Sequence, residues 1–300
     1  MSYILLQLVR LFVVFSSECV KFLVTLVFVY TGSGSIRKGN ELIKFEFILK
    51  PYELIKMSVP SLAYAIQNNL DFVALSNLDA SVYQVFNQLK IPFTAVFMML
   101  FLRRQFSLRR WFSIFQLCIG LALVELDISK VYKNSQKEEN NLNKFEDETE
   151  KNQFIGLLAI FGACIFSSFA GVYFEKMLKD GSSNTPFWIR NLQMYSCGVI
   201  SAFLGCLIKD YNQIIERGFL FGYNTKVVCI IRMLSLGGIY ISLIMKHLDN
   251  LYKSFASSLS IIMVVIFSLF IFDGYNITFL FGLGALLVCL SVIFYNSAEH

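Results

Sequence analysis

The sequence predicts an all-α polytopic membrane protein, and three observations support this fold class. Hydrophobic residues make up 56% of the 300 residues and charged residues only 16%, whereas a soluble domain has about 25% charged residues. The apolar residues occur in successive runs of about 20, a length that crosses a hydrocarbon layer of roughly 30 Å as a helix. Because lipid offers no hydrogen-bond partners, each backbone amide must be paired within its own segment, which favours helices over open strands.

We expect nine transmembrane helices. The first segment carries Arg10, Glu18 and Lys21 and lacks a small-residue cleavage site, so it is interpreted as a span and not as a removed signal peptide. The predicted spans are residues 4–30, 54–76, 79–101, 108–126, 153–178, 186–208, 226–247, 250–272 and 276–296.

The positions of lysine and arginine predict the orientation of these spans. Cytoplasmic loops accumulate both residue types, and the alternate short loops at 76–80 and 273–276 contain neither. The C-terminus is therefore predicted to be cytosolic and, with nine spans, the N-terminus lumenal. The basic residues that define the cytosolic loops are Arg37, Lys38, Lys44, Lys50, Arg103, Arg104, Arg109 and Arg110.

A polar segment divides the chain into two halves. Residues 127–152 have mixed charge and few apolar side chains, a composition typical of a disordered linker, and the topology places this linker in the lumen. The N-terminal half, residues 1–126, has four predicted spans, and the C-terminal half, residues 153–300, has five.

A weak internal repeat supports this division. At an offset of 170, residues 76–101 align with residues 246–271, so that Asp79 pairs with Asp249 and Ile91 with Ile261. Transporters built from duplicated helix bundles show such self-similarity, with a substrate site at the repeat interface. The fifth span has no counterpart in the first half, so we expect either a truncated chain or a nine-span variant of a five-plus-five plan.

Polar side chains within two neighbouring spans are the first candidate site residues, because such groups are costly in hydrocarbon. Tyr83, Asn87 and Lys90 have the i, i+4 and i+7 spacing of one helical face. This stripe offers a ring, an amide and a cation, the groups that stack a base, read its edge and neutralise phosphate. The alternative is interhelical hydrogen bonding, with Lys90 snorkelling to an interface. The preceding span adds Tyr64, Gln67, Asn68, Asn69 and Asp71.

A second candidate set lies in the other half. Asn191 and Tyr195 share a helical face at i, i+4, and Lys253 lies about one turn into its predicted helix. Snorkelling is the alternative interpretation of Lys253. Glu18 and Lys21 are expected to form a structural or gating ion pair.

The sequence contains no pattern for catalysis, for a cofactor or for a metal. No loop has a nucleophile and base pair, a glycine-rich phosphate loop or an acidic metal cluster, and the seven cysteines lie in apolar runs without a CxxC pair. No basic patch interleaves with exposed aromatic residues, which argues against nucleic-acid binding. We therefore expect a protein that is not an enzyme, with no catalytic residue and no cofactor.

Several long motifs carry a resemblance to a known family. They are "VPSLAYAIQNNLDFVALSNLDASVYQVFNQLKIPFTA" (59–95), "FAGVYFEKMLK" (169–179), "WIRNLQMY" (188–195), "GFLFGY" (218–223), "GGIYISLIMKHLDNLYKSFASSLSI" (237–261) and "FGLGALLVCLSVIFY" (281–295). With these motifs the chain resembles, over residues 16–296, the Golgi pyrimidine nucleotide-sugar transporters of the drug/metabolite transporter superfamily. The resemblance implies ten helices in two inverted five-helix repeats, of which the first helix is missing here. It also implies a Golgi membrane location and exchange of a cytosolic nucleotide sugar for a lumenal nucleoside monophosphate by alternating access.

The same resemblance implies a nucleotide pocket. Two lysines would bind the phosphates, Asn191 would read the pyrimidine edge, and the tyrosines would pack against base and ribose. The chain departs from the family at Asn87, where a tyrosine is common, and at Ser254, where a glycine is common. The residues that match the family's pocket are Tyr64, Asn68, Tyr83, Lys90, Asn191, Tyr195, Ser242 and Lys253.

Two questions stay open at the level of sequence. Tyr195 in "LQMY" and the motif "GGIYIS" look like the CMP-sialic acid transporters, whereas "FASSLSI" looks like the UDP-galactose and UDP-N-acetylglucosamine transporters. The alternative to transport is a transport-deficient paralogue that assembles with glycosyltransferases or full-length transporters. A homo-oligomer is a further possible assembly.

Overall fold

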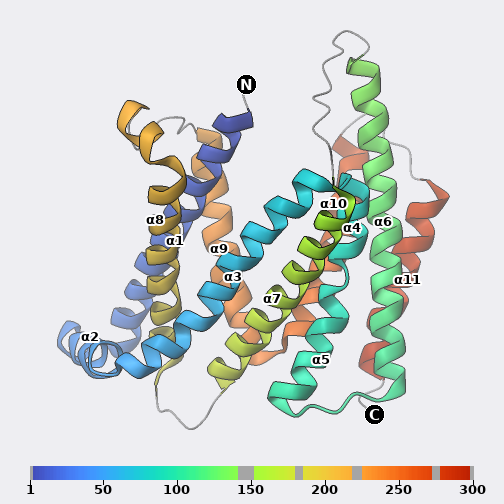
Figure 1. Cartoon of the computed structure of the whole chain (residues 1–300). Helices are drawn as coiled ribbons and strands as arrows, with labels where there is room; N and C mark the ends of the chain where they lie inside the picture. The colour runs from blue at the N-terminus through green and yellow to red at the C-terminus, as the bar shows by residue number, and fades with distance from the viewer. Residues whose placement is uncertain (1–2, 141–151, 180–184, 218–224, 272–277, 298–300) are drawn as a thin grey trace. The chain divides into compact units, whose positions relative to one another are not determined.

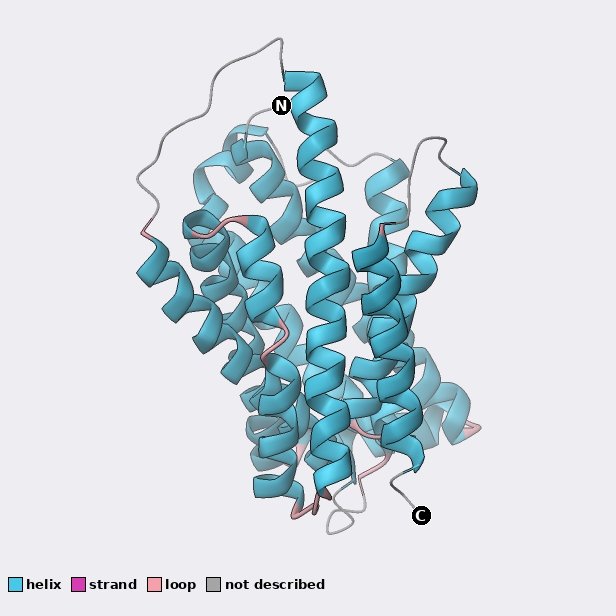
Figure 2. Ribbon diagram, turned by 90° about the vertical axis from the view of Figure 1, so that its right-hand side faces the viewer, coloured by secondary structure: helices cyan, strands magenta, loops and turns pink. Residues whose placement is uncertain are grey.

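The computed structural model describes residues 3–140, 152–179, 185–217, 225–271 and 278–297, and these residues are helical almost throughout (Figures 1 and 2). Within these ranges there is no β-strand. The helices are α1 Tyr3–Ser33, α2 Ile36–Ile43, the π-helix η1 Lys44–Ile48, α3 Pro51–Asn77, α4 Ala80–Asn87, α5 Lys90–Leu102, α6 Leu108–Asn140, α7 Gln153–Lys179, α8 Phe187–Arg217, α9 Thr225–His247, α10 Asn250–Ile271 and α11 Phe279–Ser297.

The predicted fold class is confirmed, because seven segments of the described chain are long and apolar enough to cross a membrane. They lie in α1, in α4 with α5, and in α6, α7, α9, α10 and α11. The two other predicted spans, residues 54–76 and 186–208, are helical as parts of α3 and α8, and their passage through the membrane stays a prediction. The loop at 273–276 lies outside the described residues.

The chain forms two compact units. The first unit consists of Met1–Ala65 and Phe174–Leu248, and the second of Ile66–Tyr173 and Asp249–His300. In the first unit α1 packs against α8 and α9, and in the second α6 packs against α4 and α11, with α10 against α5 and α11. Each unit thus draws helices from both sides of the predicted linker, and the division into sequence halves stays a prediction.

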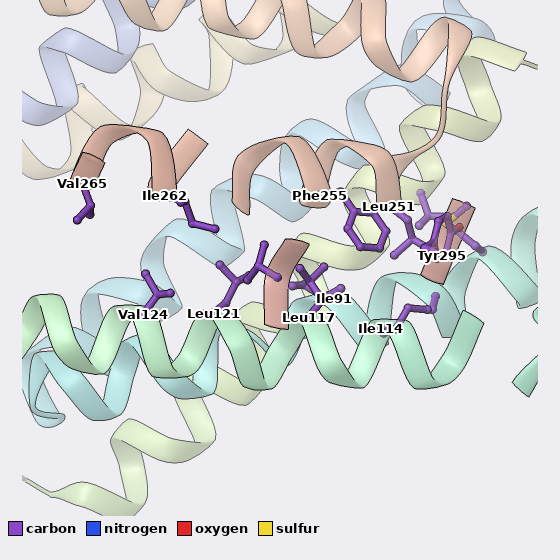
Figure 3. Close-up of a cluster of buried hydrophobic side chains, with 14 of the residues drawn as sticks. Ile91, Ile114, Leu117, Leu121, Val124, Leu251, Phe255, Ile262, Val265 and Tyr295 are labelled. Atoms are coloured by element: carbon purple, nitrogen blue, oxygen red, sulfur yellow. The ribbon is translucent and has the colours of Figure 1, made fainter. Parts of the chain in front are cut away.

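A buried apolar core holds the second unit together (Figure 3). Leu121 and Val124 on α6 point toward α10, where Phe255 and Ile262 belong to the same cluster. Tyr295 on α11 is 2% exposed and stacks at a tilt against Phe255, with 4.8 Å between the ring centroids. The core fixes α6, α10 and α11 relative to one another within this unit.

Two glycines allow α6 and α11 to approach closely. A Cβ atom on Gly284 would lie 2.8 Å from the carbonyl oxygen of Gly120, closer than any real Cβ contact. Gln116 adds a polar link, since its Nε2 donates to the carbonyl oxygen of Leu287 at 3.2 Å. Small residues and interhelical hydrogen bonds are the usual means of helix association in a membrane, where the hydrophobic effect between helices is absent.

The predicted span at residues 79–101 is confirmed by the membrane-crossing segment Ser81–Leu102, but its α-helix is interrupted by a two-residue turn between α4 and α5. Pro92 explains the break: it has no amide hydrogen to donate to the carbonyl of Gln88, and its ring crowds that carbonyl. The Gln88 carbonyl oxygen instead accepts a bond from the amide of Ile91 at 3.0 Å. Tyr83 therefore lies on α4 and Lys90 on α5, with the turn between them.

The last helix of the predicted N-terminal half is longer than expected. Helix α6 continues to Asn140, into the first part of the segment predicted to be a disordered linker. Residues 129–140 include lysine, glutamate and glutamine, which lose little side-chain freedom in a helix and so favour its extension. Residues 141–151 of the predicted linker lie outside the described residues.

Candidate functional site

The carboxylate of Asp71 holds two side chains of the second unit. The hydroxyl of Tyr83 donates to Oδ1 of Asp71 at 3.0 Å, and Nε2 of Gln67 donates to Oδ2 at 3.1 Å. Each of these three residues is half-buried. Tyr83, one of the predicted site residues, is therefore held in place from α3 by a charge-assisted hydrogen bond.

Hydrogen bonds from two hydroxyl groups hold the backbone of Lys90, directly after the turn between α4 and α5. Ser168 on α7 donates to the carbonyl oxygen of Lys90 at 2.7 Å, and Thr94 donates to the same oxygen at 2.7 Å. The thiol of Cys164 lies 3.5 Å from the carbonyl oxygen of Phe86. The thiol of Cys118 lies 3.6 Å from the carbonyl oxygen of Gln88. Side chains of α6 and α7 thus contact backbone carbonyl groups on both sides of the turn between α4 and α5.

Lys90 and Lys253 lie close enough in the second unit to interact electrostatically. Both side chains are partly buried, and neither ammonium group makes a hydrogen bond or an ion pair with any residue of the described ranges. Lys90 also interacts with the carboxyl groups of Glu125 and Asp71. Two ammonium groups in one partly buried region are suited to binding a phosphate.

The start of α10, which carries Lys253, is anchored by Asp249. Oδ1 of Asp249 accepts bonds from the backbone amides of Leu251 and Tyr252 at 3.1 and 3.0 Å, and Oδ2 accepts one from Arg104 at 2.6 Å. Asp249 is 2% exposed, so its carboxylate is committed to these structural contacts. The N-terminal turn of α10 is fixed as a result.

Glu125 on α6 is a charged group of this region that the sequence analysis missed. It accepts a hydrogen bond from Nε2 of Gln88 at 2.9 Å and interacts electrostatically with Lys90. An acid within the apolar run "LALVELD" is the signal that would have identified it.

Asn191 and Ser242 form a buried pair in the first unit. They are 1% and 2% exposed, and the hydroxyl of Ser242 donates to Oδ1 of Asn191. Nδ2 of Asn191 donates to the carbonyl oxygen of Phe187, one turn earlier in α8, at 3.0 Å. These two bonds fix the plane of the Asn191 amide.

Tyr195 lies one turn after Asn191 and also contacts α9, so the prediction of a shared face for these two residues is confirmed. Its hydroxyl donates to the carbonyl oxygen of Gly238 at 3.3 Å, and its ring centroid is 5.2 Å from the ammonium of Lys21. Lys21 is ion-paired with Glu18 on α1, as predicted. The first unit therefore surrounds Tyr195 with an ion pair on one side and α9 on another.

The two remaining predicted residues lie on α3. Tyr64 is half-buried and Asn68 is exposed, and neither side chain has a hydrogen bond within the part of the chain that the structure describes. The first unit contains Tyr64, Asn191, Tyr195 and Ser242, and the second contains Asn68, Tyr83, Lys90 and Lys253. That all of them line one nucleotide pocket stays a prediction.

The described residues contain no cluster of three or more histidine, cysteine, aspartate or glutamate side chains that could hold a metal ion. The lysines, amides and hydroxyls described above are groups that can bind an organic anion.

Comparison with known proteins agrees with this chemistry. The family model "Nucleotide-sugar transporter" matches residues 7–296. The UDP-galactose translocator 1 of Caenorhabditis elegans is 51% identical over 289 residues, which cover 96% of this chain and 78% of the relative. The UDP-N-acetylglucosamine transporter of Mus musculus is 38% identical over 281 residues, which cover 93% of this chain and 82% of the relative.

These matches confirm the resemblance inferred from the motifs and the expectation that the chain is not an enzyme, because the relatives are transporters. Together with the membrane-spanning helices, they lead to one conclusion. The chain is a multi-pass membrane protein that belongs to the nucleotide-sugar transporter family.

Proposed function

We propose that this protein exchanges cytosolic UDP-galactose or UDP-N-acetylglucosamine for lumenal UMP across the Golgi membrane by alternating access. The observation that carries the proposal is the 51% identity with a protein named UDP-galactose translocator, over 96% of the chain. The relatives named for UDP-N-acetylglucosamine, at 38% identity, support the second sugar. Since these names specify UDP sugars, they favour them over the CMP-sialic acid that "LQMY" suggested.

In this proposal the phosphates are bound by Lys90 and Lys253. Both ammonium groups are partly buried, interact with each other and make no ion pair within the described ranges. A diphosphate carries enough negative charge to offset both, and each lysine can donate up to three hydrogen bonds to it. The fixed backbone of Lys90, with its carbonyl bonded to Ser168, keeps this cation at a defined position.

The uracil edge is bound by Asn191. An amide side chain has two N–H donors and two lone pairs on its oxygen, and Asn191 uses one donor on Phe187 and one lone pair on Ser242. One donor and one lone pair are left for the alternating donors and acceptors of a pyrimidine edge. Tyr64, Tyr83 and Tyr195 supply aromatic surface for base and ribose.

Exchange can be tested with the purified full chain in proteoliposomes. Vesicles preloaded with UMP should take up UDP-galactose or UDP-N-acetylglucosamine faster than empty vesicles, whereas preloading with CMP should have little effect. Faster uptake of CMP-sialic acid into CMP-loaded vesicles would overturn the choice of substrate. Uptake that ignores the internal nucleotide would overturn exchange.

The same experiment addresses the transport-deficient alternative. A paralogue that only assembles with glycosyltransferases or full-length transporters would bind UMP when purified and show no flux in vesicles. The proposed topology, with the C-terminus in the cytosol, is tested by attaching a C-terminal epitope and permeabilising only the plasma membrane. An epitope that stays inaccessible until the Golgi membrane is opened would contradict this orientation.

A further inference from the structure

The segment that connects α1 to α3 combines exposed apolar side chains with exposed cations. It spans residues 36–52, comprises α2, η1 and the start of α3, and is called the connecting segment below. It lies at the end of the first unit where α1 ends (Figure 1). Five of its side chains are between 57% and 74% exposed, namely Ile36, Phe45, Ile48, Leu49 and Tyr52. Water is a poor environment for so many adjacent apolar groups.

The same segment carries cations that have no acidic partner. Lys38 and Lys44 are exposed, and neither forms an ion pair with any of the described residues. Arg37 lies 3.6 Å from Glu41, and its side chain is 90% exposed, so this contact leaves most of the guanidinium accessible. Exposed apolar groups interspersed with unpaired cations are the composition of helices that lie in the surface of an anionic membrane.

The connecting segment is firmly attached to the protein rather than loose. Nε2 of Gln193 on α8 donates to the backbone carbonyl oxygen of Glu46 at 3.0 Å, and the hydroxyl of Thr185 donates to Oε2 of Glu46 at 2.8 Å. Gln193 is 1% exposed. Lys50 adds an ion pair to the same carboxylate at 2.7 Å. One face of the segment is thus committed to α8, which leaves the apolar and basic side chains to the outside.

The π-helix η1 lies at this attachment point. Its wider turn changes which backbone carbonyls are available to outside donors, and π-helical turns occur frequently at functional sites. The Glu46 carbonyl that accepts the bond from Gln193 belongs to η1. Because Gln193 lies between Asn191 and Tyr195 on α8, the connecting segment is tied to the helix that carries two proposed substrate contacts.

We propose that the connecting segment is a binding surface for anionic phospholipid, in which Lys38 and Lys44 contact the headgroup phosphates and Phe45, Ile48 and Leu49 enter the acyl region. Each lysine near an anionic membrane surface contributes about 1 kcal/mol of attraction. The apolar side chains make the lipid, and not a free phosphate compound, the preferred ligand. This proposal is independent of which substrate the protein transports and of the direction of transport.

The test uses the purified full chain in a neutral detergent, with its unfolding temperature measured while lipid is added. Phosphatidylserine should raise the unfolding temperature, whereas phosphatidylcholine and the soluble headgroup glycerophosphoserine should not. The double variant Lys38→Ala, Lys44→Ala should bind phosphatidylserine roughly 30-fold more weakly, with an unchanged unfolding temperature in phosphatidylcholine.

A matched control removes the same charge elsewhere. Arg103→Ala, Arg109→Ala also deletes two exposed cations, but from the second unit, and should retain the phosphatidylserine effect. An equal loss in both double variants would overturn the proposal in favour of general surface charge, and an equal effect of glycerophosphoserine would overturn it in favour of a free-anion site. If phosphatidylserine has no effect and Phe45→Ser converts a dimer into a monomer, a second copy covers the segment and the proposal is wrong.

Discussion

The hydroxyl of Ser168 lies 2.7 Å from the carbonyl oxygen of Lys90 and donates a hydrogen bond to it. This contact joins α7 to the first residue of α5, directly after the break that Pro92 causes. The carbonyl that lacks its helical donor because of Pro92 is that of Gln88, whereas Lys90 lies in the first turn of α5. The bond from Ser168 is therefore a link between two helices, and the position of Lys90 depends on α7 as well as on α5.

Replacing Ser168 should weaken both folding and nucleotide binding. Ser168→Ala removes one donor, although Thr94 still bonds to the same carbonyl, so we expect a loss of about 1 kcal/mol of unfolding free energy. We also expect weaker UMP binding, because the backbone of Lys90 is less restrained. Unfolding curves and UMP titration measure the two effects. Ser257→Ala, at an exposed position, is the control and should change neither.

The two lysines of the second unit should be required for nucleotide binding. Lys90→Gln and Lys253→Gln keep a polar N–H donor and lose the charge, and a charge-assisted hydrogen bond contributes about 1.5–3 kcal/mol. We therefore expect each variant to bind UMP about 10- to 100-fold more weakly, as measured by isothermal titration. Lys246→Gln, at an exposed lysine in the last turn of α9, should bind normally. Unchanged affinity in Lys90→Gln or Lys253→Gln would make that lysine a snorkelling residue.

Gly284→Ala and Gly282→Ala should have opposite effects on stability. At Gly284 the added methyl group would meet backbone atoms of α6, with the Gly120 carbonyl oxygen at 2.8 Å, and overpacking of this kind costs about 1–3 kcal/mol. At Gly282 nothing lies within 4 Å of the added Cβ, so alanine's higher helix propensity should stabilise α11 by up to about 1 kcal/mol. Thermal unfolding of the two variants side by side measures the difference. Equal stabilities would show that α6 and α11 do not pack as described.

Asn191 and Ser242 should be energetically coupled. Ser242→Ala leaves the buried Oδ1 of Asn191 without this donor, and an unsatisfied buried polar group costs about 1–3 kcal/mol. Once Asn191→Ala is present, the second substitution should cost much less. A double-mutant cycle of unfolding free energies measures the coupling, which we expect to be at least about 0.5 kcal/mol. Additive costs would contradict the hydrogen bond.

The attachment of the connecting segment should weaken in acid. The hydrogen bond from Lys50 lowers the pKa of Glu46, and burial partly opposes this shift. The hydrogen bond from Thr185 and the charge of Lys50 lower the pKa further. Because the pKa of the folded state is below that of the unfolded state, the stabilisation is fully present above the ordinary carboxyl pKa. It is lost as the pH falls through the folded-state value, below about pH 4.3.

Glu46→Gln should therefore reduce the loss of stability in acid, as measured by the unfolding temperature across that pH range. Glu41→Gln, on the exposed side of α2, is the matched control. It should leave the acid dependence as it is. A control variant that flattens the profile as much as Glu46→Gln would assign the effect to net charge instead.

The helical plan could be predicted from sequence because apolar run length alone determines it. Long runs predict spans, and within the described ranges each predicted span corresponds to one helix except residues 79–101, which form α4 and α5. The break before Lys90 was missed because hydrophobicity continues across it, although Pro92 was visible. The extension of α6 to Asn140 was missed because a polar composition is compatible with both a linker and a solvated helix.

The sequence was sufficient to identify most of the candidate site residues, but not to predict their hydrogen-bond partners. Asn191, Tyr195 and Lys253 were recognised because polar groups within apolar spans are costly, whereas Ser242 came only from family resemblance. Serine bonds to its own helix so often that its presence in a span carries little information. Its role as the donor to Asn191 depends on how α8 and α9 are packed, which no local pattern encodes.

The thiol of Cys164 has a practical consequence for kinetic studies. It is buried and lies 3.5 Å from the carbonyl oxygen of Phe86, where α4 ends, so an alkylating reagent can reach it only when that region separates from α7. Its rate of modification would then count opening events at the interruption between α4 and α5. The alkylation rate of this native cysteine can in this way report the rate of local opening, without any label being introduced.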